Sequence, residues 1–364
     1  MISQKTVFYF LLFITIAHIL FAVYIYRSDI FLKFNAHYWA DKYNRSQWAD
    51  AWSDQPIGDD GLYTYAGYAY VNGKDPSLLN AETPPLGKYF IGFFETVTGY
   101  WGVFSLFFGC LSLIALYFLN TRLFENKLTA LVPVAVFSFD PIFTQQLRAP
   151  FLDTMYLTFL LFCFYFFLKK NYLVSGAFAG AFMATKSPFQ IVLLLAAFVI
   201  FLFVQKKKLI KPLGSIAIAT VVIYILSYTR LFLLGRNPIY FLKVQKYILA
   251  FYGSGAKGVP GAVFPMLTLG YWQTWFAGNG YIVEWTPLWT ISLLLSILAI
   301  ILVIRKRNYK DSMLLIVVWF ILYLGFLTVI PIFPRYLLLL LPFGYNLSVW
   351  VLSKSTALKF SRQL

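Results

Sequence analysis

Long apolar runs alternate with short polar connections along the chain, and this pattern predicts membrane-spanning helices. Runs such as 7–26 and 291–304 lie at or near the length that crosses a hydrocarbon core of about 30 Å as a helix. They do not alternate apolar and polar residues at every second position, as the strands of an outer-membrane barrel do. We therefore expect an all-α polytopic membrane protein with about 10–11 transmembrane helices. The clearest spans lie near 7–26, 101–119, 128–139, 151–168, 172–185, 188–204, 213–233, 286–304, 312–330 and 335–352.

Two segments, 27–100 and 234–285, are too polar and too long to be simple turns, and the span count places both on one face. In the first, Leu62, Ala66 and Tyr70 recur at helical spacing, so we expect a large first extracytoplasmic loop carrying interfacial helices. The second contains a run of glycines and prolines that breaks regular structure. With no separate soluble domain visible in the sequence, residues 1–364 are expected to form a single membrane domain.

Composition and charge support this class. The chain is 60% hydrophobic and 12% charged, whereas soluble domains are about 45–50% apolar and about 25% charged. With a cytoplasmic N-terminus, the inner connections carry 16 of the 30 basic residues and 2 of the 14 acidic ones. The positive-inside rule describes this asymmetry, so the net charge of +16 requires no nucleic-acid partner. We expect an integral protein of the cell (plasma) membrane, surrounded by membrane lipids, with its active site on the extracytoplasmic side.

Cysteine and histidine give no sign of a metal centre. Cys110 and Cys163 fall inside apolar spans and are interpreted as buried free thiols. His18 and His37 belong to no HExxH motif and to no paired Cys/His spacing, which argues against a histidine-based zinc site. No cofactor is therefore assigned from these residues.

Two adjacent carboxylates, Asp59 and Asp60, are the catalytic candidates. Neighbouring side chains on a regular element point in different directions, so one can face a cavity as a general base while the other orients the loop or a substrate hydroxyl. The alternative is that both are solvated loop acids, or that they cap a helix beginning near Leu62.

A third carboxylate, Glu82, precedes the turn Thr83-Pro84-Pro85. Each proline fixes its own φ and restricts the residue before it, so the turn should hold Glu82 in one place, as binding of a sugar hydroxyl or a divalent metal ion requires. The metal remains unassigned, with Glu82 its only candidate ligand. The alternative is a plain turn that starts an interfacial helix, with Lys88 reaching toward the headgroups.

Further ionisable residues lie where other spans meet the outer face. Arg148 and Asp153 stand five residues apart, and the planar guanidinium suits a lipid phosphate while Asp153 would hold it in place. Lys186 and Arg335 add outer cations, and we group them with Glu82 and Lys88 as substrate-binding candidates. The alternative is that these residues are ordinary interface anchors.

Taken in order, these motifs resemble the protein O-mannosyltransferases and the bacterial lipid A aminoarabinose transferases, which are C-type glycosyltransferases that use polyprenyl-phosphate sugars. The resemblance covers roughly residues 55–190. It rests on Asp59-Asp60 with Tyr63 and Ala66, Gly73-Lys74-Asp75-Pro76, Pro84-Pro85-Leu86-Gly87-Lys88, Leu147-Arg148-Ala149 with Asp153, and Ala184-Thr185-Lys186.

The resemblance implies an active site at the outer membrane boundary. Asp59 looks like the catalytic aspartate, Asp60 like the acid that follows it, and Arg148 with Asp153 like the pair at the head of the fourth span. Two features depart from the mannosyltransferases. Thr83 stands where they usually have histidine, so that Glu82 brings the motif nearer to the aminoarabinose enzymes, and the additional soluble domains of many members are missing.

The sequence thus predicts a glycosyltransferase that moves a sugar from a polyprenyl-phosphate carrier to a protein hydroxyl or a lipid acceptor on the non-cytoplasmic face, by a single inverting displacement. The competing hypothesis is a transporter or flippase for a lipid-linked or anionic substrate. Transporters tend to place ionisable residues near the bilayer midplane and often show internal repeats, whereas here the charges gather at one face. A non-catalytic lipid-binding subunit is a third alternative.

Overall fold

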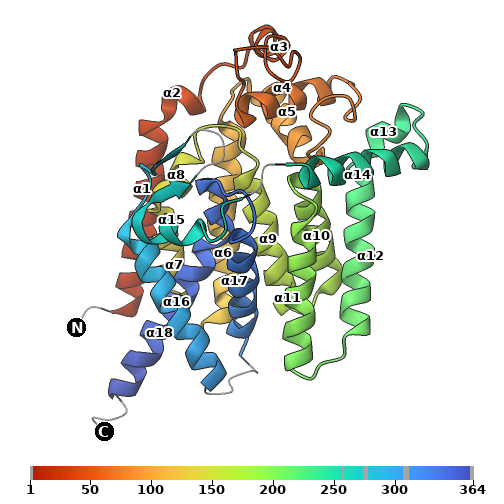
Figure 1. Ribbon diagram of the computed structural model, residues 1–364. Coiled ribbons are helices and arrows are strands. Elements are labelled where there is room, and N and C mark those ends of the chain that lie inside the picture. Colours follow the sequence, from red (N-terminus) through yellow and green to blue (C-terminus); the bar gives the residue numbers. More distant parts are fainter. Residues whose placement is uncertain (1–2, 256–257, 274–277, 306–310, 361–364) are drawn as a thin grey trace.

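Apolar helices form an upright bundle in the computed structural model, which describes residues 3–255, 258–273, 278–305 and 311–360 (Figure 1). Eight of the ten predicted spans each coincide with one helix, whereas 213–233 and 335–352 each cover two helical elements, and the all-α polytopic fold is confirmed. α1, α6 and α16 are long and apolar enough to cross a membrane, whereas six of the others are shorter apolar helices. The bundle helices are α1 (Gln4–Ile25), α6 (Val103–Leu123), α7 (Lys127–Ser138), α9 (Asp153–Leu168), α10 (Tyr172–Thr185), α11 (Gln190–Val204), α12 (Ile210–Leu226), α16 (Pro287–Arg305), α17 (Met313–Leu327) and α18 (Leu341–Phe360).

The last predicted span begins later than expected. Residues Pro334–Leu339 form a short 3-10 helix, η1, and the α-helix α18 starts only at Leu341. Proline is favoured in the first turn of a helix and disfavoured in its interior, so Pro342 suits a helix that begins just before it better than one that begins at 335. The connection that results carries Arg335 to the outer end of the bundle.

The first outer loop folds into short helices at the end of the bundle opposite both chain termini (Figure 1). Two of them, α4 and α5, pack so closely that a Cβ on Gly92 would lie 2.1 Å from the carbonyl oxygen of Gly67. Only glycine permits this approach. The short helices predicted for this loop are therefore present, and their placement in a membrane interface stays a prediction. They are α2 (Arg27–Ile30), α3 (Ala36–Asn44), α4 (Asp59–Val71) and α5 (Leu86–Thr98).

The second outer segment also contains regular structure. α14 ends at Gly253 and α15 begins at Val263, so the run of glycines and prolines lies between them as predicted, although 256–257 and 274–277 fall outside the described residues. Tyr271 pairs with Tyr281 in a two-stranded antiparallel hairpin. The elements of this segment and its approach are α13 (Thr229–Leu233), α14 (Pro238–Gly253), α15 (Val263–Leu269), β1 (Tyr271–Gln273) and β2 (Asn279–Tyr281).

Three contacts join the outer segments across the end of the bundle. Arg236 forms an ion pair of 3.2 Å with Asp75, and the Arg230 guanidinium donates to the carbonyl oxygen of Gly73 at 2.6 Å. Ser77 and Tyr240 also share a hydrogen bond of 3.1 Å. These contacts place α14 beside the first outer loop.

Candidate functional site

Four charged side chains of alternating sign form a row at the outer end of the bundle. Arg335 Nη2 lies 2.6 Å from Asp59 Oδ2, and Arg335 Nε lies 3.8 Å from Asp153 Oδ2. Lys186 Nζ in turn lies 2.6 Å from Asp153 Oδ1. The structure therefore brings together four of the eight residues selected from the sequence, from regions as far apart as 59 and 335.

The local structure explains why these side chains meet. Asp59 and Asp153 each occupy the first turn of a helix, α4 and α9, where the helix dipole stabilises a negative charge. Lys186 directly follows α10, and Arg335 lies in η1. The aromatic rings of Phe333 and Phe151 lie 4.7 and 5.6 Å from the Arg335 guanidinium carbon, which keeps the cation at this position through cation–π contacts.

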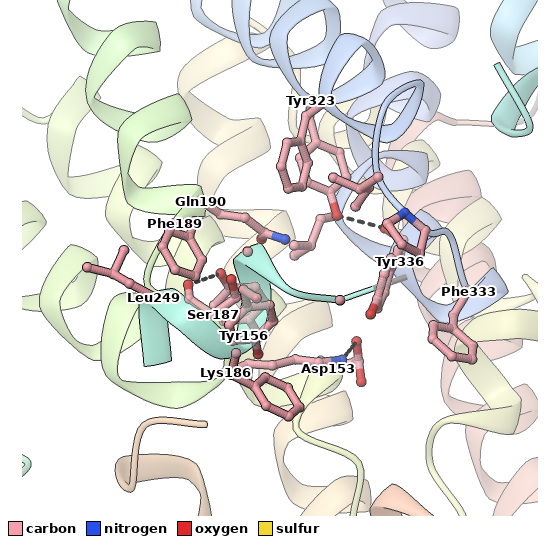
Figure 2. Close-up of a pocket in the computed structure, with 18 residues that line it drawn as sticks. Asp153, Tyr156, Lys186, Ser187, Phe189, Gln190, Leu249, Tyr323, Phe333 and Tyr336 are labelled. Carbon is pink, nitrogen blue, oxygen red and sulfur yellow. Dashed lines mark hydrogen bonds and ion pairs between the residues drawn. The ribbon is translucent and has the colours of Figure 1, made fainter. Parts of the chain in front are cut away.

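A cavity of about 600 Å³ lies beside the Asp153–Lys186 pair, and Figure 2 shows the residues that line it. Its polar lining includes Gln190, Ser187 and the tyrosines 156, 252 and 336, but most of its wall is apolar. Burial lowers the pKa of the Lys186 amino group, and the neighbouring Asp153 carboxylate opposes this change. An apolar cavity lined by the cation Lys186 suits a ligand that joins a hydrocarbon chain to an anionic group. The apolar wall consists chiefly of Phe189, Leu249, Phe251, Phe326, Ile330, Pro331, Phe333 and Leu339.

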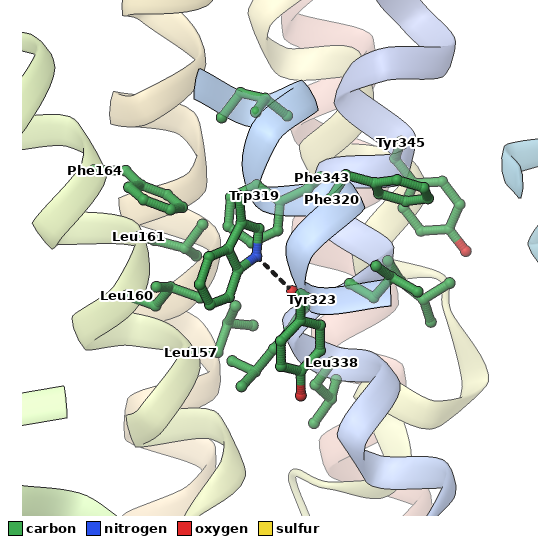
Figure 3. Close-up of a cluster of buried hydrophobic side chains, with 14 of the residues drawn as sticks. Leu157, Leu160, Leu161, Phe164, Trp319, Phe320, Tyr323, Leu338, Phe343 and Tyr345 are labelled. Atoms are coloured by element: carbon green, nitrogen blue, oxygen red, sulfur yellow. Dashed lines mark hydrogen bonds between the residues drawn. The ribbon is translucent and has the colours of Figure 1, made fainter. Parts of the chain in front are cut away.

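Figure 3 shows the core that anchors η1, where α9, α17 and α18 meet. The indole of Trp319 is fully buried and donates to the carbonyl oxygen of Leu339 at 3.0 Å, and Tyr323 donates to the carbonyl oxygen of Tyr336 at 3.1 Å. These two bonds satisfy carbonyl groups of η1 that an irregular connection would leave unpaired. They thereby fix the backbone that follows Arg335.

We expect Trp319→Phe to lower the free energy of unfolding by about 1–3 kcal/mol, because the buried Leu339 carbonyl loses its donor. Thermal unfolding in detergent measures the effect. Trp48→Phe is the matched control, since the Trp48 side chain is exposed at the outer surface and its replacement should change stability little. Equal melting temperatures for the two variants would show that the indole hydrogen bond does not anchor η1.

Asp60 lies next to the row without forming an ion pair among the residues that the structure describes. Burial raises the pKa of its carboxyl group, and the negative charge of Asp59 adds to this, while backbone N–H groups at the start of α4 oppose it. Both acids stand inside the first turn of α4, whose N-cap is Gly58. The alternative that they cap a helix beginning near Leu62 is therefore wrong.

Glu82 and Lys88 are buried and are linked through Asn80. Lys88 is 0% exposed, and its ammonium group donates to the carbonyl oxygens of Asn80 and Thr83 and to the side-chain oxygen of Asn80 at 2.5, 2.7 and 2.9 Å. Asn80 adopts a left-handed φ of 50° and its amide donates to Glu82. Burial raises the pKa of Glu82, and burial lowers that of Lys88 to about 7 against the opposing effect of Glu82.

This geometry corrects both interpretations of Lys88. The side chain does not reach toward headgroups, and its three protons are used by the protein itself, which leaves no surface for a substrate. Its contacts instead hold the turn that carries Glu82 and Thr83. No group of three or more histidine, cysteine or acidic side chains lies together in the described part of the chain, so a metal at Glu82 stays a prediction from sequence alone.

Arg148 lies apart from the position expected for it. Asp153 pairs with Lys186 and Arg335, whereas the Arg148 guanidinium lies over the ring of Tyr26 at 5.9 Å. The prediction that Asp153 holds the Arg148 guanidinium is therefore wrong. α9 begins at Asp153, and this side chain meets Lys186 and Arg335 there. A phosphate-binding role for Arg148 stays a prediction.

Several site residues were not selected from the sequence. Tyr63 donates to Asp59 Oδ2 at 3.4 Å, and its position one helical turn after Asp59 was a usable signal. Tyr252, Tyr336 and Gln190 line the cavity, and no local pattern distinguishes them from the many other aromatic and polar residues of the outer segments.

Comparisons with known proteins show which families and folds the chain is similar to. Residues 82–229 match the family model of the dolichyl-phosphate-mannose-protein mannosyltransferases. No curated protein shows significant sequence similarity to the chain. The fold is similar to the crystal structure of ArnT from Cupriavidus metallidurans in the apo state, with a TM-score of 0.65 and 14% identity over 96% of this chain and 61% of ArnT.

A second crystal structure of the same ArnT, bound to undecaprenyl phosphate, gives a TM-score of 0.62 and 14% identity over 93% of this chain and 60% of ArnT. The resemblance to protein O-mannosyltransferases and lipid A aminoarabinose transferases is thus confirmed by a partial family match and a shared fold. The chain spans about three fifths of the length of the ArnT structures.

Proposed function

We propose that the protein is a glycosyltransferase that moves a sugar from a polyprenyl-phosphate carrier to a hydroxyl group of a protein or lipid acceptor. The observation that carries this proposal is the row Asp59, Arg335, Asp153 and Lys186 at the edge of the apolar cavity. The row offers a carboxylate to accept a proton and cations to bind a phosphate, beside a space for hydrocarbon. The family match and the ArnT structure bound to undecaprenyl phosphate support the same donor class.

Asp59 acts in this proposal as the general base. The acceptor oxygen attacks the anomeric carbon on the side opposite the phosphate, the proton passes to Asp59, and the bond between the anomeric carbon and the phosphate oxygen breaks. One displacement inverts the anomeric centre. Lys186 and Arg335 stabilise the charge that develops on the departing phosphate, and Asp60 orients the loop or the acceptor.

The active site faces the non-cytoplasmic side of the plasma membrane in this proposal. The site lies at the end of the bundle opposite both termini (Figure 1), and the basic inner connections favour a cytoplasmic location for those termini. The position of the charges at one end also disfavours the transporter hypothesis, because transporters bind substrate near the bilayer midplane.

Cysteine labelling tests this orientation. In a background with Cys110 and Cys163 replaced by alanine, a membrane-impermeant maleimide should modify cysteines introduced at exposed sites within 55–75 and 258–262 from outside, and should spare those at 206–208 and 305. Positions 256–257 and 306–310, which belong to the same loops in sequence, lie outside the described residues. Labelling of 206–208 from outside would invert the topology.

An assay of donor cleavage tests the activity itself. The protein in nanodiscs is supplied with polyprenyl phosphates that carry different radiolabelled sugars, together with extracts of protein and lipid acceptors. A glycosyltransferase joins the label to an acceptor and releases polyprenyl phosphate, whereas a flippase moves the intact donor across a vesicle membrane. Translocation without cleavage would reject the enzyme in favour of the transporter.

A further inference from the structure

Arg335 contacts Asp59, the proposed base, and also faces Asp153 in the proposed phosphate site. Its Nη2 is bound to Asp59 Oδ2 at 2.6 Å, while its Nε faces Asp153 Oδ2 at 3.8 Å, beyond hydrogen-bond distance. Both of these facing atoms are buried, and neither has a hydrogen-bond partner in the part of the chain that the structure describes. The guanidinium is thus hydrogen-bonded to Asp59 through Nη2, while its Nε, which faces Asp153, is incompletely paired.

The carboxylate oxygen of Asp59 that accepts from the Arg335 guanidinium is occupied by that hydrogen bond and is not free to take a proton from an acceptor. A phosphate competes well for the same cation, since the planar guanidinium binds two phosphate oxygens at once. Asp59 and a phosphate bound beside Lys186 are therefore rivals for Arg335.

The surroundings of Arg335 permit such a change of partner. Phe333 and Tyr336 present their rings 4.7 and 6.0 Å from the guanidinium carbon. Ring faces attract the charge without using its N–H groups, so the cation can remain between the rings while its hydrogen bonds change. The Arg335 side chain is 17% exposed and that of Asp59 is 37% exposed, so the pair lies where ligands have access and is not locked in the core.

We propose that Arg335 is exchanged between Asp59 and the phosphate of the donor, so that Asp59 is freed as a base only when the donor is bound. This inference rests on the proposed function and makes Arg335 a positioning residue that links the two halves of the site. The link is reciprocal. A bound phosphate draws Arg335 away from Asp59, and the attraction of Asp59 for Arg335 in turn lowers the affinity of the site for the phosphate. Donor binding should then precede productive acceptor binding.

The reciprocal effect gives a test with a definite sign. Asp59→Asn removes the rival anion, so undecaprenyl phosphate should bind this variant about 5- to 30-fold more tightly than it binds the wild type. Binding is measured in nanodiscs of neutral lipid, with undecaprenol to detect tail binding alone and inorganic phosphate to detect binding of the headgroup alone. If Asp59 merely orients Arg335 for the phosphate, affinity falls instead.

Asp60→Asn controls for the general loss of negative charge near an anion site. Asp60 is adjacent to Asp59 but forms no ion pair with Arg335, so its replacement should tighten binding much less. In an Arg335→Gln background, Asp59→Asn should no longer improve binding. Equal effects of the two asparagine variants, or a gain that persists without Arg335, would overturn the exchange. Absence of undecaprenyl phosphate binding to the wild type would instead reject the proposed donor class.

Discussion

Asp59→Asn is expected to lower the rate of sugar transfer by about 10²- to 10⁴-fold, the range that a positioned general base contributes. Asparagine keeps the size and shape of the side chain and can still contact Tyr63 and Arg335, but it cannot accept the acceptor proton. The loss should appear in turnover at saturating donor, and binding of the donor should not weaken, because the base acts on the other substrate. Single-turnover assays with a preloaded polyprenyl-phosphate sugar measure it directly.

Asp41→Asn serves as the matched control for this variant. Asp41 lies on α3 in the same outer loop, forms an exposed ion pair with Arg45, and has no ion pair with the described residues of the charged row. Its replacement should leave turnover close to that of the wild type, since exposed ion pairs contribute little. Near-wild-type turnover of Asp59→Asn would remove Asp59 from the mechanism and leave Asp60 as the carboxylate to test.

The spans were predictable because lipid imposes a simple rule on sequence. A helix that crosses hydrocarbon must be apolar along its length, so the runs could be located within a few residues. The exception at 335–340 also had a local signal. Pro334 and Pro342 bracket this segment, and proline is disfavoured in a helix interior. Hydropathy alone does not distinguish the 3-10 helix that carries Arg335 from the apolar α-helix that follows it.

The partners within the site were less predictable than its members. Placing Asp59, Asp153, Lys186 and Arg335 on one face needed only the order of spans. The pairing of Asp59 with Arg335, however, joins residues 276 positions apart and depends on how η1 packs against α9 and α17. Neighbours in sequence were a poor guide, as the separation of Arg148 from Asp153 shows.

Lys88 illustrates a different limit. A lysine in an amphipathic interfacial segment is normally expected to extend toward water or headgroups, because burial of an unpaired ammonium group is costly. Here that cost is offset by three oxygen acceptors from a single turn, including the left-handed Asn80. Such a compensating set appears only once the turn is folded, so burial of this residue could not be read from its neighbours.

Lys186 is expected to contribute most to phosphate binding, and Lys186→Gln should weaken the binding of undecaprenyl phosphate by about 2–5 kcal/mol. Two effects add in the same direction. The variant loses a cation at the cavity edge, and it leaves Asp153 without its 2.6 Å partner, so that an uncompensated carboxylate repels the incoming anion. Lys186→Arg keeps the charge but not the compact ammonium geometry, and it should restore only part of the affinity.

Arg148→Gln supplies the comparison that decides where the phosphate sits. Arg148 lies over Tyr26, away from the Asp153–Lys186 pair, and its replacement removes an equal charge from the same outer face. If the phosphate binds at the cavity edge, Arg148→Gln should alter affinity by less than about 1 kcal/mol, as is usual for a cation that acts only at long range across a partly screened surface. If instead Arg148→Gln abolishes binding while Lys186→Gln retains it, the donor phosphate binds beside Tyr26, and the assignment made from the sequence holds against the one made from the cavity.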